Sequence, residues 1–322
     1  MHISFIIPVY NVEKYVEKAI MSVVNNNWGE YDFEIIIVDD ESPDNSVEII
    51  KNIKTQYPEV SINIISQKNK GLGGARNTGV DNATGDYLFF LDSDDYILQG
   101  VFVDLLDKAY HHNLDVLEFA AKRVDEKNEW IDEVFLLSTK GRVLSGDQYV
   151  TEVSFANSAC NKLYKREFLQ SDNIRFIERV YIEDAPFNVE VFLKAKRVEA
   201  WDVVAAAYLQ NTSSITRSKR SGQYLEKFIE DSITVTARIF ELSKHYQTHK
   251  AQQKIKTKVA FFTAGILRMI LMNNTISAQQ KQAAYRKLQE NNLMPFYHPT
   301  GSYVRTCFLY AANMLFPIIK KI

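Results

Sequence analysis

Two hydrophobic periods alternate over the first ninety residues and together predict an α/β sheet. Short continuous apolar runs, typical of buried strands, occupy residues 2–9, 33–38, 61–65 and 86–91. Between them, apolar residues recur at helical spacing in the segments 12–24, 47–53 and 75–83, where Asn45 or Ser46 can cap the second helix. Strands and helices that alternate in this way predict a Rossmann-like, mainly parallel sheet with helices on both faces.

Acidic side chains follow directly after two of the predicted strands. Asp39 and Asp40 come after the strand at 33–38, and Asp92, Asp94 and Asp95 come after the strand at 86–91. Ligands of parallel sheets bind beyond the carboxyl ends of the strands, so these side chains are expected in one crevice. Carboxylates this close repel one another unless a cation compensates them, and Mg²⁺ or Mn²⁺ carrying phosphates suits such oxygen ligands. The alternative is an Asp-rich turn that only caps the next helix.

The segment 70–77, Lys-Gly-Leu-Gly-Gly-Ala-Arg-Asn, is rich in glycine. It predicts a flexible loop whose backbone can approach a ligand, with Arg76 supplying a fixed positive charge. A plain turn before a helix is the alternative. The glycine spacing excludes a dinucleotide-binding fingerprint, and the absence of Gly-Lys-Ser/Thr excludes a phosphate-binding P-loop.

Composition is that of a folded globular protein. Of 322 residues, 46% are hydrophobic and 24% charged, which excludes a disordered or low-complexity class. The two cysteines, Cys160 and Cys307, cannot form a disulfide framework or a zinc site by themselves, and this favours a reducing compartment, the cytosol. The segment 1–8 has the pattern of a first strand rather than of a secretion signal.

Charge divides the chain into two parts. Residues 217–322 hold 17 Lys and Arg against 5 Asp and Glu, whereas residues 1–216 hold 21 against 35. The basic part reads as helices, with apolar positions from Leu225 to Leu242, from Val259 to Met272 and from Cys307 to Ile319. These runs are too short or too interrupted to span a bilayer. A basic helical surface can face phospholipid headgroups or a lipid-linked diphosphate; solvated, ordinarily packed helices are the alternative.

Several motifs in this order and spacing resemble the family-2 inverting glycosyltransferases, which have a GT-A-type nucleotide-sugar domain. The match covers about residues 1–216 and is similar to bacterial members that build surface polysaccharides. The matching segments are Ile7–Asn11, Ile37–Ser46, Gly74–Gly79, Phe90–Asp95, Asn161–Lys165 and Tyr181–Asp184.

The resemblance implies a set of donor-binding roles. Asp39 would accept a hydrogen bond from the base, Pro8 and Tyr10 would line the nucleoside pocket, and Arg76 would lie beside the base or the phosphates. In the Asp-x-Asp motif, Asp92 would contact ribose and share the metal that Asp94 ligates, with Asp95 supporting them. The metal, Mn²⁺ or Mg²⁺, would neutralise the departing diphosphate.

The resemblance also points to Asp184 as the catalytic base that takes the proton of the acceptor hydroxyl, with Glu183 beside it. Because neighbours at a helix start point in different directions, only one of the two is expected to face the sugar. The alternative is that both carboxylates simply favour a helix N-terminus.

Two departures from the family pattern stand out. Glu41 replaces a glycine that many members have after the double Asp. In the segment 208–217, expected to form a loop over the diphosphate, Asn211 stands where an Arg is common. Arg217, Lys219 and Arg220 are expected to contact phosphate there or to be solvated.

The sequence thus predicts a metal-dependent inverting hexosyl- or N-acetylhexosaminyltransferase that uses a nucleotide sugar, UDP-linked by preference. Residues 1–216 would form the catalytic domain, and residues 217–322 a basic helical region on the acceptor side or at a membrane interface. The acceptor would be a glycan, either free or linked to a lipid diphosphate. The protein would lie in the cytoplasm or at the inner face of the membrane. No nucleic-acid partner is expected.

Two other classes are alternatives: a catalytically idle nucleotide-sugar-binding partner of another transferase, and a sugar nucleotidyltransferase. The second needs a glycine- and arginine-containing loop after the first strand, where Val9–Glu13 stands. Sugar contacts from Arg123, Trp130 and Lys162 stay open, because each side chain can equally be structural.

Overall fold

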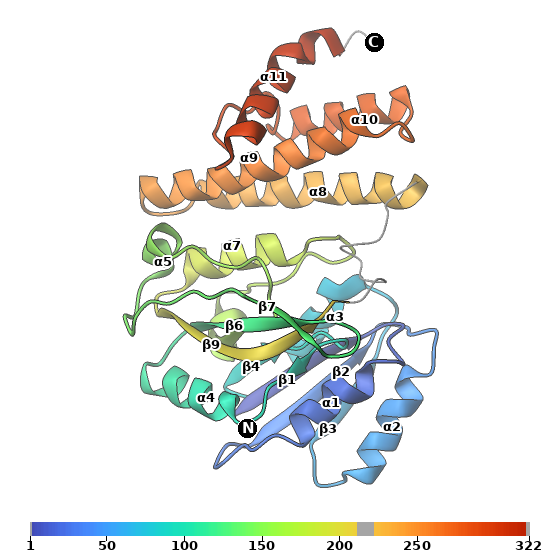
Figure 1. Cartoon of the computed structure of the whole chain (residues 1–322), viewed down its shortest axis with the longest axis vertical. Coiled ribbons are helices and arrows are strands. Elements are labelled where there is room, and N and C mark those ends of the chain that lie inside the picture. The colour runs from blue at the N-terminus through green and yellow to red at the C-terminus, as the bar shows by residue number, and fades with distance from the viewer. Residues whose placement is uncertain (1, 211–221, 320–322) are drawn as a thin grey trace.

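A nine-stranded mixed sheet forms the centre of the protein (Figure 1). The computed structural model describes residues 2–210 and 222–319, without the side chains of 315–319. In the described residues the strand order is β3-β2-β1-β4-β8-β6-β9-β5, and β7 pairs with β6. The strands are β1 (Ile3–Val9), β2 (Phe33–Asp39), β3 (Ile62–Ser66), β4 (Tyr87–Phe90), β5 (Tyr96–Ile97), β6 (Val116–Val124), β7 (Trp130–Val134), β8 (Lys162–Lys165) and β9 (Val198–Leu209).

The four strands predicted from hydrophobic runs are neighbours and run parallel. β1 lies between β2 and β4, and β2 pairs in turn with β3. β8 is antiparallel to both β4 and β6, so β6 and its parallel neighbour β9 again point the same way as β1. The predicted α/β class is confirmed, with antiparallel strands added beyond β4.

Helices cover both faces of the sheet, because side chains along β1 alternate between two apolar cores. Ile3, Phe5 and Ile7 join a core with α1 (Val16–Val24), α2 (Ser46–Gln56) and α4 (Val101–His111). Ile6 joins the other, larger core. That core includes α3 (Gly71–Asn82), α5 (Gly146–Glu152), α6 (Arg166–Ser171) and α7 (Asp184–Lys194).

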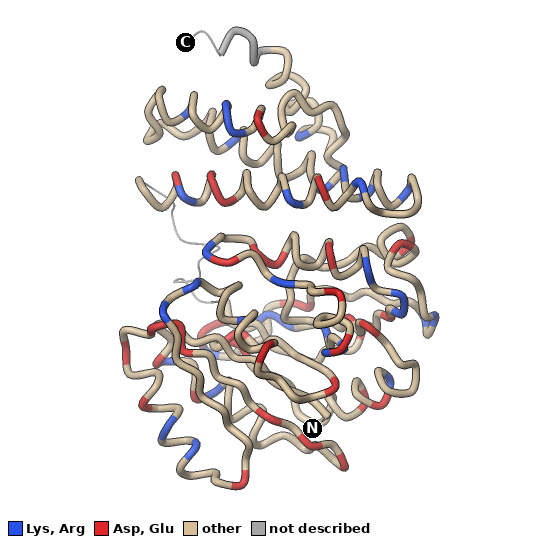
Figure 2. The backbone as a smooth tube through the Cα atoms, turned by 180° about the vertical axis from the view of Figure 1, so that it is seen from behind, with Lys and Arg blue, Asp and Glu red and all other residues tan. Residues whose placement is uncertain are grey.

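Four further helices stack beyond α7 and continue the larger core: α8 (Gly222–Ser243), α9 (His249–Met272), α10 (Ala278–Glu290) and α11 (Tyr303–Ile319). In Figure 2, Lys and Arg recur along α9 and α10, where the predicted basic excess lies, whereas α8 carries four Asp and Glu against two Lys and Arg. Of the helices in the described part of the chain, none has both the length and the apolar content that a bilayer crossing needs. The predicted domain boundary at residue 216 lies outside the described residues.

The glycine-rich segment is helical, which corrects the prediction of a flexible loop. α3 begins at Gly71, and its glycines allow close packing. A Cβ at Gly73 would lie 2.5 Å from the Ile177 carbonyl oxygen, and one at Gly79 would lie 2.2 Å from Ile6 Cγ2. Both distances are shorter than any van der Waals contact. The glycines therefore bring α3 against β1 and against the chain before α7.

We predict that Gly79→Ala destabilises the protein by about 1–3 kcal/mol, because its methyl group would overpack the contact with Ile6. Chemical denaturation measures the change in unfolding free energy. Gly265→Ala in α9 is the matched control, since a Cβ there meets no atom within 4 Å. That variant should be neutral or slightly more stable. Equal effects of the two substitutions would contradict the packing argument.

Candidate active site at the carboxyl edge of the sheet

The predicted donor-binding residues lie at one edge of the sheet. Pro8 is buried near the end of β1, and Tyr10, just beyond it, is 53% exposed. Val9 pairs with Asp39 at the end of β2, while β4, on the other side of β1, leads to Asp92. Asp39 is buried, and its Oδ1 accepts a hydrogen bond from the Ser42 amide at 2.9 Å. The nucleoside contacts inferred from the resemblance stay predictions.

Asp40 fixes the start of α3, a role that the sequence reading missed. Its carboxylate accepts hydrogen bonds from the amides of Lys70 and Gly71 at 2.8 and 2.9 Å and from Gln67 Nε2 at 2.7 Å. A carboxylate at a helix N-terminus satisfies amides that have no partner within the helix. Asp40 thereby joins the end of β2 to the helix that carries Arg76.

Arg76 is the centre of the candidate site. Its side chain is only 1% exposed, and three carboxylates surround it. Nη1 lies 2.7 Å from Glu183 Oε1 and 2.7 Å from Asp184 Oδ1, and Nη2 lies 2.8 Å from Asp92 Oδ1. Burial by itself would lower the pKa of Arg76, but the charges of Asp184, Asp92 and Glu183 outweigh it and raise the pKa well above its ordinary value. One buried cation thus draws the end of β4 and the start of α7 together, and a direct contact of Arg76 with the donor stays a prediction.

Both acidic residues at the start of α7 reach Arg76, and the expectation that only one of them faces the sugar stays a prediction. They differ in access, because the Asp184 side chain is 24% exposed and that of Glu183 only 8%. Burial, followed by the charge of Asp184, raises the pKa of Glu183 to about 7. Burial also raises the pKa of Asp184, against the pull of Arg76. Asp184 is therefore the more accessible proton acceptor of the pair.

The chain before β8 supports Asp184 from a second side. The Ala159 amide donates to Asp184 Oδ2 at 3.1 Å, and the thiol of Cys160 lies 3.6 Å from Arg76 Nη2. Lys162 holds this segment by donating to the carbonyls of Ala156 and Ser158. Because Lys162 is fully buried, its position accords with the structural alternative rather than with a sugar contact.

α8 clamps the turn that precedes the acidic pair. Asp231 Oδ2 accepts from the Tyr181 amide at 3.0 Å, and Lys227 donates to the Arg179 carbonyl at 2.8 Å while pairing with Asp231. Within the turn, Arg179 and Ile182 have φ of 59° and 65°. A positive φ is unfavourable for a β-branched residue and must be held by surrounding contacts. The helical region thus helps to set the position of Glu183 and Asp184.

Only some of the carboxylates in the Asp-rich turn after β4 are available as metal ligands. Asp92 faces Arg76 and is one-third exposed, and Asp94 is half-buried. Asp95 is buried and accepts from the Leu209 amide at 2.8 Å, and burial with the nearby charges of Asp94 and Asp92 raises its pKa well above the ordinary value. Among residues 2–210 and 222–319, no group of three or more His, Cys, Asp or Glu is arranged around a common metal position. The donor set fits an ion held by one or two carboxylates and completed by phosphate oxygens.

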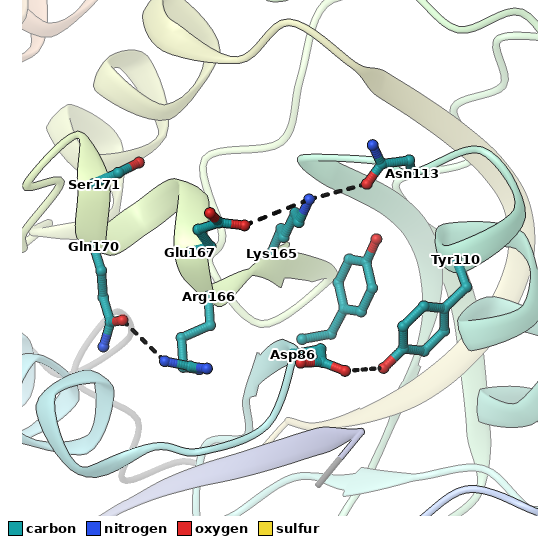
Figure 3. A pocket seen from close by; sticks show the side chains of 9 residues that line it. Asp86, Tyr110, Asn113, Lys165, Arg166, Glu167, Gln170 and Ser171 are labelled. Carbon is teal, nitrogen blue, oxygen red and sulfur yellow. Dashed lines mark hydrogen bonds and ion pairs between the residues drawn. The ribbon is translucent and has the colours of Figure 1, made fainter.

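A separate polar cavity of about 430 Å³ lies before β4, at the opposite end of that strand from Asp92 (Figure 3). Its charged side chains are paired with neighbours: Asp86 accepts from the Tyr110 hydroxyl at 2.8 Å, and Lys165 donates to Asn113 at 2.9 Å. This cavity lacks the buried arginine and the acidic pair that lie at the carboxyl edge of the sheet. The carboxyl edge is therefore the candidate active site.

An acidic turn follows the central parallel strand β4, and Arg76 joins it to the acidic pair at the start of α7. This arrangement is typical of a GT-A-type domain that binds a nucleotide sugar at the carboxyl edge of its sheet. The family model described as glycosyl transferase family 2 matches residues 4–171. The chain belongs to this family, as the resemblance predicted.

Two bacterial glycosyltransferases are similar to the chain in sequence. The chain is 33% identical over 219 residues to the uncharacterised glycosyltransferase EpsJ of Bacillus subtilis, covering 66% of this chain and 62% of EpsJ. It is 26% identical to TarS of Staphylococcus aureus, a poly(ribitol-phosphate) β-N-acetylglucosaminyltransferase, over 70% of this chain and 37% of TarS. The chain thus spans less than two thirds of each of these relatives.

Solved structures share the fold at low sequence identity. A crystal structure of TarS 1–349 superposes with a TM-score of 0.70 at 19% identity, covering all of this chain and 90% of that one. The mannosyltransferase PcManGT of Pyrobaculum calidifontis, in complex with GDP-Man and Mn²⁺, has a TM-score of 0.54 at 13% identity, covering 97% and 87%. These likenesses confirm the GT-A fold class.

The structure bears on the two positions where the sequence departs from the family pattern. Glu41, at the position where glycine is common, has a φ of 67°, and its carboxylate accepts from the Asn69 amide at 3.2 Å. The position does adopt the backbone conformation that favours glycine. Of the predicted loop over the diphosphate, Asn211, Arg217, Lys219 and Arg220 lie outside the described residues.

We predict that Arg76→Met destabilises the protein by about 3–5 kcal/mol near pH 8, because it leaves buried carboxylates without a cation. The loss should shrink as the pH falls toward about 7 and then level off, because the pKa of Glu183 is about 7 beside Arg76 and is higher without that cation, so the variant's carboxylate takes up its proton at a higher pH. Denaturant unfolding at several pH values measures this. Arg175→Met, which breaks an exposed pair with Asp81, is the control and should cost under about 1 kcal/mol at every pH. A pH-independent loss in Arg76→Met would contradict the electrostatic explanation.

Proposed function

We propose that this protein is an inverting glycosyltransferase that moves a sugar from a nucleotide sugar to a hydroxyl of a glycan acceptor. The observation that carries the proposal is the accessible carboxylate of Asp184, held by Arg76 opposite the Asp-rich turn. A nucleophile's base and a leaving group's stabilising residues must lie on opposite sides of the reacting carbon in an inverting displacement. Asp184 and the Asp92–Asp94 turn provide two such groups at one edge of the sheet.

In the proposed reaction, Asp184 accepts the proton of the acceptor hydroxyl while that oxygen attacks the anomeric carbon. The new carbon–oxygen bond forms as the bond to the diphosphate breaks, and the nucleoside diphosphate leaves with the electron pair. Arg76 and the Ala159 amide each hold one oxygen of Asp184 and so fix its orientation. Glu183, which is more buried, supports Arg76 rather than touching the sugar.

For the donor, we assign Asp39, Pro8 and Tyr10 to the nucleoside and Asp92 to the ribose. Their common position at the carboxyl ends of β1, β2 and β4 supports this assignment. A UDP-linked sugar is the proposed donor, in line with a structure of TarS in complex with UDP-GlcNAc. The transferred sugar would then be a hexose or an N-acetylhexosamine.

We further propose that Asp94, with Asp92, binds Mn²⁺ or Mg²⁺ together with the donor phosphates. Such ions keep few protein ligands and take the rest from phosphates and water, which suits the two carboxylates present. The bound ion would neutralise charge that develops on the diphosphate. A relative of the same fold in complex with GDP-Man and Mn²⁺ supports this proposal.

The acceptor is proposed to be a growing surface glycan such as a capsule, exopolysaccharide, lipopolysaccharide or teichoic-acid-type polymer. TarS and a β-glucosyltransferase of Bacillus spizizenii are named for transfer to poly(ribitol-phosphate). We place the reaction in the cytoplasm, at the inner face of the membrane, because α9 carries five Lys and Arg and no acidic residue, which suits an anionic surface. The two-part organisation, with catalysis in residues 1–216, belongs to the same proposal.

We predict that Asp184→Asn lowers turnover roughly 10²- to 10⁴-fold, because the amide cannot accept the hydroxyl proton. Single-turnover transfer from the donor identified below measures the effect. Asp81→Asn, at an exposed ion pair of α3, is the matched control and should keep wild-type turnover. Wild-type turnover in Asp184→Asn would remove this residue from the mechanism and favour an idle binding partner.

A thermal-shift panel tests the donor and the ion together. We expect one of UDP, GDP, CDP and dTDP, UDP by preference, to stabilise the protein in the presence of Mn²⁺. At about a hundred times the dissociation constant the gain should be roughly 2.7 kcal/mol. Asp94→Ala should abolish the Mn²⁺-dependent part. The absence of any nucleotide shift would overturn the donor-site assignment, and a shift that ignores Mn²⁺ would overturn the metal assignment.

A further inference from the structure

One peptide group joins the buried side chain of Lys162 to the carboxylate of Asp184. The carbonyl oxygen of Ser158 accepts a hydrogen bond from Lys162 Nζ at 2.7 Å. The amide of Ala159, which belongs to the same peptide group, donates to Asp184 Oδ2 at 3.1 Å. The amide dipole therefore has its negative end toward the cation and its positive end toward the carboxylate. Hydrogen bonds arranged in such a chain polarise and strengthen one another.

The ammonium group of Lys162 directs its hydrogen bonds at the segment just before β8. A lysine side chain has three donors, and here they reach the Ala156 carbonyl at 3.1 Å, the Ser158 carbonyl and Asn161 Oδ1 at 2.8 Å. Because the side chain of Lys162 is fully buried, it can influence a substrate only through its neighbours. The neighbour that leads to the candidate active site is the peptide group between Ser158 and Ala159.

Glu118 holds Lys162 from the other side. Both side chains are fully buried, and Glu118 Oε1 lies 3.2 Å from Lys162 Nζ. The same carboxylate accepts from the Ala156 amide at 2.9 Å and from the Tyr149 hydroxyl at 2.6 Å. A buried ion pair adds little net stability, because the desolvation of both charges offsets their attraction. Its main effect here is to fix the position of the chain at residues 156–159.

The charges of Lys162 and Asp184 also act on each other. Burial lowers the pKa of Lys162, and the carboxylates of Glu118 and Asp184 oppose this fall. Burial raises the pKa of Asp184, and the charges of Arg76 and Lys162 both oppose this rise. Two cations thus favour the ionised form of Asp184, Arg76 by direct contact and Lys162 through the intervening peptide group.

We propose that Lys162 is a positioning residue for the transfer reaction. Through the peptide group between Ser158 and Ala159, it fixes the orientation of the Asp184 carboxylate toward the acceptor hydroxyl. This inference rests on the function proposed above, in which Asp184 is the catalytic base. The alternative is that Lys162 supports only the fold, in which case the effect of its loss on turnover would not depend on Asp184.

A double-mutant cycle between Lys162 and Asp184 tests the inference, with turnover of the donor that the nucleotide panel identifies as the readout. Lys162→Met should lower kcat roughly 10- to 100-fold and leave the donor KM within about twofold, because small displacements of a catalytic group have effects of that size on the chemical step. In the Asp184→Asn background the same substitution should cause no further loss, since no base remains to be positioned.

Lys258→Met is the matched control for removal of a lysine from this region. Lys258 of α9 donates to the side chain of Asn157 at 3.0 Å, next to the bridging peptide group rather than at it. This variant should keep the wild-type kcat and KM. A loss of kcat equal to that of Lys162→Met would overturn the inference, because the peptide bridge would then make no difference.

A paired variant guards against failure to fold. Lys162→Met leaves Glu118 as an unpaired buried charge, which is strongly destabilising. Glu118→Gln/Lys162→Met removes both charges and keeps an amide that can bond with Tyr149 and Ala156, so it should fold and show the same loss of kcat. An unchanged nucleotide thermal shift in the paired variant shows that the donor-binding edge is intact.

The amide proton of Ala159 gives a second measurement that needs no transfer. In protein carrying isotope-labelled alanine, its NMR resonance is identified by its absence from Ala159→Gly. We expect this resonance to move upfield in Asp184→Asn and in the paired variant, because the bond to the carboxylate loses its charge or becomes longer. It should stay in place in Lys258→Met. An unmoved resonance in the paired variant would overturn the inference.

The cycle also separates this inference from the proposed function. Slow turnover in Asp184→Asn, with an equal further loss when Lys162 is replaced, would refute the positioning role alone, as would wild-type kcat in both Lys162 variants. Wild-type turnover in Asp184→Asn would refute the proposed base and the positioning role with it.

Discussion

The interaction on which the rest of the site depends is the burial of one guanidinium among three carboxylates. Arg76 is almost entirely removed from solvent, and Asp92, Glu183 and Asp184 come from a strand end and a helix start that are distant in sequence. The charges of Arg76 and Glu183, the two most buried of the four, would each be strongly destabilising without a partner. Their mutual compensation makes the position of each dependent on the others, and so fixes the shape of the sheet edge.

This constraint explains features that otherwise look unrelated. Asp40 holds the start of α3, and the glycines of that helix allow it to lie against β1. Together these contacts fix the position of Arg76 at the carboxyl edge of the sheet. On the other side, the Ala159 amide and the α8 clamp hold the start of α7. The two layers of the protein therefore converge on the same ion cluster.

Much of this arrangement could be predicted from the sequence, for a physical reason. Continuous apolar runs and helical spacing are local signals, and they located β1 to β4 and their helices to within a few residues. The carboxyl-edge position of Asp39 and Asp92 followed from parallel-strand geometry. The prediction of a loop for the glycine-rich segment was wrong. Its glycines are needed because Ile6 and Ile177 pack closely against the helix, and these residues lie outside the local sequence pattern. In the same way, the joint approach of Glu183 and Asp184 to Arg76 depends on a residue more than a hundred positions away.

The clamp from α8 has a thermodynamic consequence. Lys227 and Asp231 hold the backbone of Arg179 and Tyr181, so the free energy of docking the helical layer is shared with that of ordering the acidic pair. Linkage is reciprocal: whatever binds more tightly when the pair is ordered favours docked helices, and whatever favours docked helices strengthens that binding by the same factor. The turn at 179–182 is thus a coupling element between the sheet edge and the helices. Tighter docking of the helical layer therefore raises the affinity of the sheet edge for any ligand that needs the ordered acidic pair.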